Sequence, residues 1–424
     1  MLKDIPYWWD TAPALPNLTI RPLPASADVV VIGSGYTGLS AARVLALRGV
    51  QVVVLEKETF GWGASSRNGG QVLTGLKWGP SALIEKVGLM RAKELYAASL
   101  ASTKYLEDLI EEENIGCEYT RSGHVEAACK PHHFQHYQHE QEVLAREFNH
   151  QVQLIDRPDQ QRELGSQYYH GLLIDEDSGA LHPAQYARGL AICASGTGAL
   201  LFENTPATKI VCDGPRYAVV TSRGTITAEN VLVATNGYTD EAAREIGKRV
   251  FPLGSYMIAT EPLPAELAAK LIPQRRVVFD SKHYLYYFRL SSDNRLLFGG
   301  RADYQPPTPD SNRKSAEILR RGLVKVFPEL KEVSIEYAWS GNIGVTRDFF
   351  PRMGQHAGIY YALGYAGHGV AMATYLGGQI ANIMCGAQGK NPFKDLPFDP
   401  LPFYYGKAFR PFGALYYKLL DVIS

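Results

Sequence analysis

A glycine-rich turn near the N-terminus holds the residues best suited to chemistry. The run Gly33-Ser-Gly-Tyr-Thr-Gly38 spaces its glycines as G-x-G-x-x-G, and Glu56 follows 18 residues after the last glycine. Gly33 permits a tight turn, Gly35 lets the backbone approach a diphosphate, and Gly38 lets a helix pack closely on a strand. A carboxylate in the position of Glu56 can accept hydrogen bonds from a ribose diol. The spacing therefore predicts a dinucleotide-binding site.

Two further glycine-rich segments, at 61–70 and 364–369, could place bare backbone against a long cofactor. The turn at 33–38 does not by itself separate FAD from NAD. FAD carries a bulky tricyclic ring and needs more close backbone approaches than one turn supplies. A helix that starts near Gly369 would also stabilise the negative charge that a reduced flavin gains. The three segments together favour FAD, although glycines that serve only packing are an alternative for 364–369.

The tyrosine-rich stretch at 282–290 is the candidate for substrate contacts. Strand alternation would put Tyr287 and Arg289 on the same face. Aromatic walls suit an alkyl amine, and an arginine can bind a carboxylate with two hydrogen bonds. We therefore predict Tyr287 and Arg289 as catalytic-site residues, with core packing of the aromatics as the alternative. Arg301 and Arg347 are weaker candidates of the same kind.

Histidines suggest two further possibilities. His368 lies within the segment 364–369, where an imidazole could accept a proton from an amine or hydrogen-bond to the cofactor. A position near the flavin is favoured over proton transfer. His132, His136 and His139 would share one face of a helix, but no H-E-x-x-H pattern accompanies them. A solvated helix face is therefore favoured there, and no metal site is predicted.

The elements around the first turn form a βαβ unit. Residues 28–32 and 51–55 are short, apolar and β-branched, as is typical of strands buried on both faces. Residues 37–48 are predicted to form the helix between them, and its N-terminus would offer unpaired N–H groups to phosphates. A βαβ unit that binds no nucleotide is the alternative. Elsewhere the sequence predicts helices at 91–113, 133–148, 183–195, 315–327 and 370–384, and strands within 199–235, at 284–290 and at 296–298.

Composition limits the classes of function. The chain has 424 residues, which predicts two domains. Lys plus Arg and Asp plus Glu number 43 each, and this balance argues against a nucleic acid partner. The five cysteines are widely spaced without a C-x-x-C pair, so neither disulfides nor zinc are predicted and a cytoplasmic location is favoured. No signal peptide or transmembrane segment is predicted. The tail 409–424 could contact a membrane surface weakly, with packing on protein favoured instead.

Several stretches of the chain match motifs of one known family. They are Val31-Ile-Gly-Ser-Gly-Tyr-Thr-Gly-Leu-Ser40, Gly63-Ala-Ser-Ser-Arg-Asn-Gly-Gly-Gln71, Val233-Ala-Thr-Asn-Gly-Tyr238, Gly254-Ser-Tyr-Met-Ile-Ala-Thr-Glu261, Asn294-Arg-Leu-Leu-Phe-Gly-Gly-Arg301, Trp339-Ser-Gly and Gly364-Tyr-Ala-Gly-His-Gly-Val370. Across about residues 28–385 the sequence resembles the D-amino-acid oxidase superfamily of FAD-dependent oxidoreductases. Within it, the chain is most similar to gamma-glutamylputrescine oxidase-type enzymes.

The resemblance implies an α/β fold with a Rossmann-like FAD-binding domain and an inserted substrate domain that holds a large antiparallel sheet and helices. We expect residues 27–78, 180–248 and 340–390 to form the discontinuous FAD-binding domain. Residues 79–179 and 249–339 would form the substrate domain. Residues 1–26 would be an N-terminal extension and 391–424 a C-terminal tail.

The motifs and the resemblance together name the expected site. His368, Tyr287 and Arg289 are the catalytic candidates. The resemblance also implies that Ala207 contacts the adenine side through its backbone. The expected cofactor-binding residues are Gly33, Gly35, Tyr36, Thr37, Gly38, Glu56, Lys57, Ser65, Ser66, Arg67, Asn68, Gly69, Gly70, Ala207, Thr235, Asn236, Gly237, Gly341, Gly364, Gly367, His368, Gly369 and Val370.

The activity implied by the resemblance is oxidation of a carbon–nitrogen bond by hydride transfer to flavin N5. Oxygen would take the electrons and give hydrogen peroxide, and the imine would hydrolyse. Residues 339–363 contain no cysteine, so non-covalent FAD is expected. Val370-Ala-Met stands where some relatives carry a carboxylate-binding lysine, which favours gamma-glutamylputrescine or another polyamine derivative over a simple amino acid. The alternatives are a dehydrogenase that reduces a quinone or carrier, a non-catalytic flavin-binding protein and an NAD-dependent enzyme.

Overall fold

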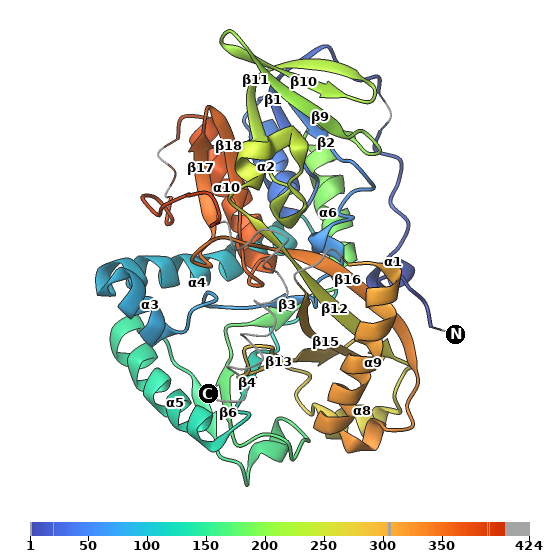
Figure 1. Ribbon diagram of the computed structural model, residues 1–424, viewed down its shortest axis with the longest axis vertical. Coiled ribbons are helices and arrows are strands. Elements are labelled where there is room, and N and C mark those ends of the chain that lie inside the picture. Colours follow the sequence, from blue (N-terminus) through green and yellow to red (C-terminus); the bar gives the residue numbers. More distant parts are fainter. Residues whose placement is uncertain (1, 20, 304–306, 388, 390, 403–424) are drawn as a thin grey trace.

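Two large sheets and the helices around them make up the computed structural model (Figure 1). The structure describes all residues except 1, 20, 304–306, 388, 390 and 403–424, and the side chains of 301 and 302 are also left out. The predicted membrane contact of the tail 409–424 therefore lies outside the described residues. Within the described part, no helix combines the length and apolarity that a membrane crossing would need.

The first sheet follows the order β17-β18-β11-β1-β2-β8, and β9 and β10 extend it through β11. Its strands are β1 (Ser26–Ile32), β2 (Val52–Leu55), β8 (Leu200–Phe202), β9 (Ala207–Asp213), β10 (Arg216–Thr221), β11 (Gly224–Val233), β17 (Arg352–His356) and β18 (Ile359–Leu363). The pairs β1–β2, β1–β11, β2–β8 and β11–β18 are parallel. All four residues of β2 are buried, as expected of a strand covered on both faces. The predicted βαβ unit is thus at the centre of this sheet.

The second sheet follows the order β16-β12-β15-β14-β13-β4-β6-β5. Its strands are β4 (His124–Ala127), β5 (Gln153–Ile155), β6 (Leu172–Asp175), β12 (Phe251–Thr260), β13 (Val277–Asp280), β14 (Tyr287–Leu290), β15 (Leu296–Asp303) and β16 (Ile335–Val345). Every pair is antiparallel except β4–β13, which is parallel. The expected α/β fold with a large, mainly antiparallel second sheet is confirmed. A short third sheet pairs β3 (Gln71–Val72) with β7 (Gly179–Ala180).

The helices cover both sheets (Figure 1). They are α1 (Tyr7–Thr11), α2 (Tyr36–Leu47), α3 (Pro80–Val87), α4 (Leu89–Glu112), α5 (Pro131–Val143), α6 (Pro183–Gly196), α7 (Arg244–Gly247), α8 (Ala265–Leu271), α9 (Pro309–Val326) and α10 (Val370–Met384). Helices α2 and α10 can pack closely because Gly377 has no side chain. A Cβ at this position would lie 2.3 Å from the Thr37 carbonyl oxygen. The Ser40 hydroxyl also donates to the Thr374 carbonyl over 2.7 Å.

Several predicted elements have different bounds in the structure. The predicted strand 284–290 is wrong in its first half, because residues 283 and 284 form a turn and β14 begins at Tyr287. The predicted helix 315–327 begins earlier, at Pro309, because Thr308 and Ser311 form a capping box. Strand β16 spans the expected boundary between domains at 339 and 340. The division of the chain into domains stays a prediction.

Candidate functional site

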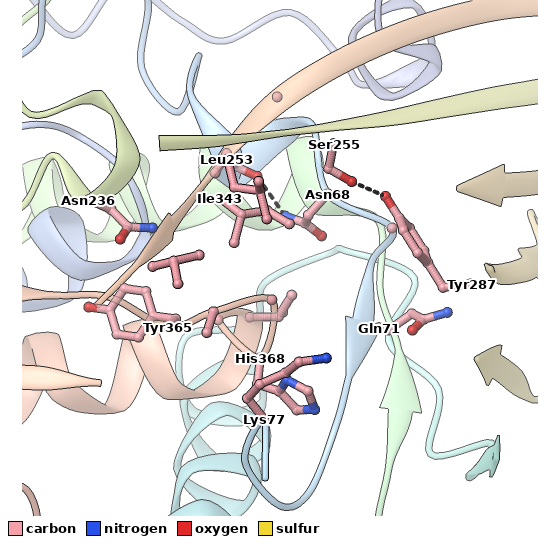
Figure 2. Close-up of a pocket in the computed structure, with 18 of the residues that line it drawn as sticks. Asn68, Gln71, Lys77, Asn236, Leu253, Ser255, Tyr287, Ile343, Tyr365 and His368 are labelled. Atoms are coloured by element: carbon pink, nitrogen blue, oxygen red, sulfur yellow. Dashed lines mark hydrogen bonds between the residues drawn. The ribbon is translucent and has the colours of Figure 1, made fainter. Parts of the chain in front are cut away.

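A cavity of about 2140 Å³ lies between the two large sheets. Its wall includes residues of the turn 33–38, of the segment 61–70 and of the loop 364–369. Strands β4, β12 and β16 of the second sheet contribute the other side. Figure 2 shows how residues of several of these segments line it, with Asn68 from 61–70, Ser255 from β12, Ile343 from β16, and Tyr365 and His368 from 364–369. None of the five cysteines, all of them free, lines the cavity.

The turn at 33–38 has the geometry that a diphosphate needs. Gly33 has a φ of +100°, and a Cβ at Gly38 would lie 1.9 Å from the Gly33 carbonyl oxygen. A Cβ at Gly35 would lie 2.9 Å from the Ser65 hydroxyl. Gly35 caps α2 without a side-chain hydrogen bond of its own. The Tyr36 N–H donates to the Ser65 hydroxyl at 3.0 Å, which leaves the next N–H groups of the first turn for an anion. These features fit the phosphates of a dinucleotide.

Glu56, at the end of β2, is held in a fixed orientation on the cavity wall. One carboxylate oxygen accepts hydrogen bonds from the Ser34 N–H (2.9 Å) and hydroxyl (2.6 Å). The other accepts from the Glu58 N–H at 3.0 Å. Lys57 and Ala207 line the same part of the cavity. An oriented carboxylate beside open space can take a ribose hydroxyl, as the sequence predicts.

The segment 61–70 is fixed by aromatic rings that no motif of the sequence predicts. The Arg67 guanidinium lies between the rings of Trp9 and Trp62, 4.4 and 4.2 Å from their centroids. It donates to the Trp62 carbonyl (2.9 Å) and the Ser340 carbonyl (3.0 Å), and burial lowers its pKa. The N-terminal extension therefore helps to position a residue of the cavity wall. Trp9 stands within a proline-rich stretch, so nothing local in the sequence indicated this contact.

The loop 364–369 and the start of α10 form another part of the wall. Helix α10 begins after Gly369 without a side-chain cap, so its first N–H groups are also available. The Thr37 hydroxyl lies 2.7 Å from the Tyr365 hydroxyl, which ties this loop to α2. Asn236 accepts a hydrogen bond from the Gly364 N–H at 2.9 Å. The N-termini of α2 and α10 thus open on the same cavity.

His368 faces this cavity as a neutral imidazole. Burial, together with the positive charge of Lys77, lowers its pKa to about 3. Its Nδ1 is buried and has no hydrogen-bond partner among the described residues. A ring with this pKa is a poor proton acceptor for an ammonium group near neutral pH. It is well suited to hydrogen-bond with a cofactor.

Tyr287 lies on the cavity wall, and its hydroxyl is 3.1 Å from that of Ser255 (Figure 2). Burial raises its pKa to about 12, so the phenol stays protonated. A Cβ at Gly299 would lie 2.2 Å from the tyrosine ring, so a glycine is needed there for the ring to fit. This placement agrees with the expected contact with substrate, which stays a prediction.

Arg289 does not face the cavity, which corrects the expectation that it binds substrate. Its guanidinium is buried and donates to the backbone carbonyls of Gly70 (3.0 Å), Leu181 (2.8 Å) and Leu290 (3.2 Å). Burial lowers its pKa to about 10. Arg289 therefore holds the end of the 61–70 segment in place. Arg347 lines a separate small hollow, and the side chain of Arg301 lies outside the described residues.

Most of the expected cofactor-binding residues line the cavity, and a few lie behind it. Those on the wall are Gly33, Gly35, Tyr36, Thr37, Glu56, Lys57, Ser65, Arg67, Asn68, Gly69, Ala207, Thr235, Asn236, Gly341, Gly367, His368, Gly369 and Val370. Those not on the wall are Gly38, Ser66, Gly70, Gly237 and Gly364. Ser66, for example, donates to the Gly61 carbonyl and accepts from the Trp9 indole. These five support the wall through packing and hydrogen bonds.

The histidines of α5 and the loop after it behave differently from one another. His132, His136 and His139 are exposed, in keeping with a solvated face. His150 is buried, with Nε2 2.7 Å from Asp175, and together with Asp177 it forms a group whose ligand atoms lie within 4.8 Å of one another. Burial opposes its protonation, but the bond to Asp175 raises the pKa of His150. Hydrogen bonding and charge account for this group without a metal ion.

Comparison with known proteins agrees with this geometry. Residues 28–383 match the family model described as FAD dependent oxidoreductase. The chain is 36% identical over 403 residues to gamma-glutamylputrescine oxidoreductase of Escherichia coli (strain K12), covering 93% of each chain. The crystal structure of glycine oxidase from Geobacillus kaustophilus superposes with a TM-score of 0.75 at 22% identity, over 89% of this chain and 99% of that one. The crystal structure of L-proline dehydrogenase from P. horikoshii superposes with a TM-score of 0.71 at 21% identity, over 92% of this chain and 99% of that one.

Proposed function

The chain belongs to the family of FAD-dependent oxidoreductases, with FAD as its cofactor, and we propose that it oxidises a carbon–nitrogen bond in a polyamine derivative. Gamma-glutamylputrescine is the first choice of substrate. Oxygen is the proposed acceptor, with hydrogen peroxide and an imine that hydrolyses as products. We also propose that the reaction takes place in the cytoplasm, in keeping with five free cysteines among the described residues.

One observation carries the proposal. Three glycine-rich segments that are far apart in sequence line a single cavity, and the N-termini of α2 and α10 open into it. A diphosphate at α2 would meet the positive end of that helix dipole. The start of α10 would stabilise negative charge on a reduced ring in the same way. A long anionic cofactor with a redox-active ring satisfies both.

The residues of the chain then have definable tasks. Bound FAD would accept a hydride, which is two electrons and one proton, from the substrate. Glu56 would hold the ribose, and Arg67, fixed by two indole rings, would keep the 61–70 segment against the cofactor. Tyr287, a protonated phenol, would orient the amine. His368, neutral near physiological pH, would hydrogen-bond to the ring and would not act as the base.

The choice of substrate rests on two further facts. The relative that is 36% identical is named for gamma-glutamylputrescine, and its likeness spans nearly the whole of both chains. The start of α10 reads Val370-Ala-Met and has no lysine to bind a carboxylate next to the reacting carbon. Both favour a substrate in which the reacting amine stands apart from any carboxylate.

Anaerobic reduction of the bound flavin tests the proposal. Gamma-glutamylputrescine, putrescine, sarcosine, glycine and D-amino acids would each be added to the holoprotein without oxygen. We expect gamma-glutamylputrescine to bleach the flavin fastest and air to restore the colour with release of peroxide. Bleaching by alpha-amino acids alone would contradict the substrate class. Slow recovery in air with rapid recovery by a quinone would identify a dehydrogenase, and no bleaching at all would identify a binding protein.

A further inference from the structure

An unpaired lysine and a weakly paired glutamate face the same part of the cavity. Lys77 follows β3, in the loop before α3, and lines the cavity next to His368 (Figure 2). It forms no hydrogen bond or ion pair within the described part of the chain, whereas the cavity's Lys282 pairs with Asp280 at 2.8 Å and Lys57 with Asp240 at 3.8 Å. Among the three lysines on the cavity wall, Lys77 is therefore the one whose positive charge is least balanced by a nearby carboxylate.

Lys77 is exposed toward the cavity. The surrounding protein lowers its pKa by desolvation, and the negative charge of Glu126 partly offsets this. An ammonium group without a partner on the wall can donate to an anionic ligand, and such charge-assisted hydrogen bonds are stronger than neutral ones.

Glu126 reaches the cavity because of the alternation along β4. Val125 and Ala127 are buried in the core of the second sheet, so His124 and Glu126 point to the opposite face. The Glu126 carboxylate lies 3.7 Å from the His124 Nε2, and the His124 ring stacks on Phe279. The Glu126 carboxylate thus keeps capacity to accept hydrogen bonds from a ligand.

Lys77 and Glu126 do not pair with each other, although the charge of Glu126 raises the pKa of Lys77 against the effect of desolvation. A cation and an anion that face one cavity without touching leave a space for a molecule that carries both charges. An alpha-amino acid group is such a molecule, with its carboxylate and ammonium on one carbon. Simple diamines have no anion for Lys77, so they would satisfy only half of this arrangement.

We propose that Lys77 and Glu126 bind the zwitterionic amino acid head of the substrate, Lys77 taking its carboxylate and Glu126 its alpha-ammonium. The inference rests on the proposed function and narrows it to amines that carry such a head, as gamma-glutamyl amines do. The reacting amine at the other end of the chain would then lie apart from both residues. Lys77 and Glu126 determine specificity and take no part in bond breaking.

Ligand binding to the holoprotein tests the proposal. N-gamma-glutamylbutylamine keeps the head and the chain but lacks the reacting amine, so calorimetric titration measures its binding without turnover. Lys77→Met and Glu126→Gln should each weaken its binding about tenfold or more, because each removes one charged hydrogen-bond partner. Putrescine lacks the head, and its apparent dissociation constant from anaerobic flavin reduction should change less than about twofold.

Two variants serve as controls. Lys77→Arg keeps the charge and should restore most of the affinity, while Lys209→Met makes the same change as Lys77→Met on the exposed strand β9, outside the cavity. FAD content should be equal in all variants. A Lys77→Met protein that keeps its FAD and binds N-gamma-glutamylbutylamine as the wild type does would overturn the proposal.

The remaining outcomes separate this inference from the proposed function. If gamma-glutamylputrescine reduces the wild-type flavin and Lys77→Met changes neither ligand's affinity, the head site is wrong and the function stands. If Lys77→Met weakens the binding of N-gamma-glutamylbutylamine but gamma-glutamylputrescine does not reduce the wild-type flavin, the head site stands and the proposed function is wrong. If the wild type binds no ligand with an amino acid head, both are wrong.

Discussion

The two ends of the cavity are built in different ways. At the end near α2, the wall is mostly backbone: glycines at 33 and 35, helix N-termini and one oriented carboxylate. At the end near β4 and β14, the wall is made of side chains such as Lys77, Glu126 and Tyr287. Backbone geometry is suited to a ligand that never changes, whereas side chains can be exchanged to suit different substrates. From this difference we propose the first end for the cofactor and the second for the substrate.

The largest effect should come from a side chain added to the backbone end. Gly35→Val would place a branched side chain where a Cβ already meets the Ser65 hydroxyl at 2.9 Å, in the path of the diphosphate. We expect FAD affinity to fall at least about 1000-fold, because the close approach of the turn is lost. Fluorescence titration of the apoprotein with FAD measures this.

Gly116→Val is the matched control, because no atom lies within 4 Å of a Cβ there. It should bind FAD as the wild type does. A Gly35→Val protein that folds and keeps FAD at wild-type affinity would show that the turn does not hold the diphosphate.

The next effect concerns a residue that supports the boundary between the two ends. Arg289→Met would leave the carbonyls of Gly70 and Leu181 without their guanidinium partner. We expect the free energy of unfolding to fall by about 2–3 kcal/mol, since the partners are buried. Denaturant unfolding of the holoprotein measures it, and the substrate KM should not change. An Arg289→Met variant that is as stable as the wild type but has a raised substrate KM would show that Arg289 contributes to substrate binding.

A smaller effect is expected from a change confined to the side-chain end. Tyr287→Phe keeps the ring against Gly299 but removes the hydroxyl near Ser255. The rate of flavin reduction should fall about fivefold, the equivalent of one hydrogen bond, with FAD content unchanged. Stopped-flow absorbance records the rate. Tyr286→Phe is the comparison, since the Tyr286 ring packs on Phe298 in the core, and equal rates in both variants would remove Tyr287 from the reaction.

The smallest effect concerns pH. The folded-state pKa of His368, about 3, lies below its ordinary value, so the imidazole stays neutral between pH 6 and 9. Replacing it in His368→Asn should leave the shape of the pH profile of flavin reduction unchanged over that range. The folded state binds fewer protons at His368 than the unfolded chain does. The free energy of unfolding should therefore fall as the pH falls below about 6.5, and this fall should be smaller in His368→Asn.

A series of anaerobic reduction rates against pH checks the first statement, and thermal unfolding between pH 7 and 5 checks the second. Loss of an ionisation from the pH profile in His368→Asn would identify this histidine as the base.

The same contrast explains what the sequence could reveal. The 33–38 turn, the strand before it and the helix after it are contiguous, so their spacing alone predicts the fold of the cofactor end. The start of α10 at Val370 was also predictable from the glycines before it. Such features depend on neighbouring residues, and the structure places them as expected.

The substrate end could not be predicted in this way. Glu126 faces the cavity because β4 pairs with β13, whose residues lie about 150 positions further along the chain. Tyr287 and Arg289 do lie on one face of β14, as alternation requires, but the Gly70 and Leu181 carbonyls cover the arginine and leave the tyrosine open. Trp9 reaches Arg67 from an extension without any periodic pattern. Each depends on long-range packing that local sequence does not encode.

A crystal structure of the holoprotein would test the central claim most directly. We expect FAD with its diphosphate at the turn 33–38, its ribose at Glu56 and its ring beside the loop 364–369, between α10 and Tyr287. A diphosphate bound elsewhere, or a ring remote from that loop, would contradict it.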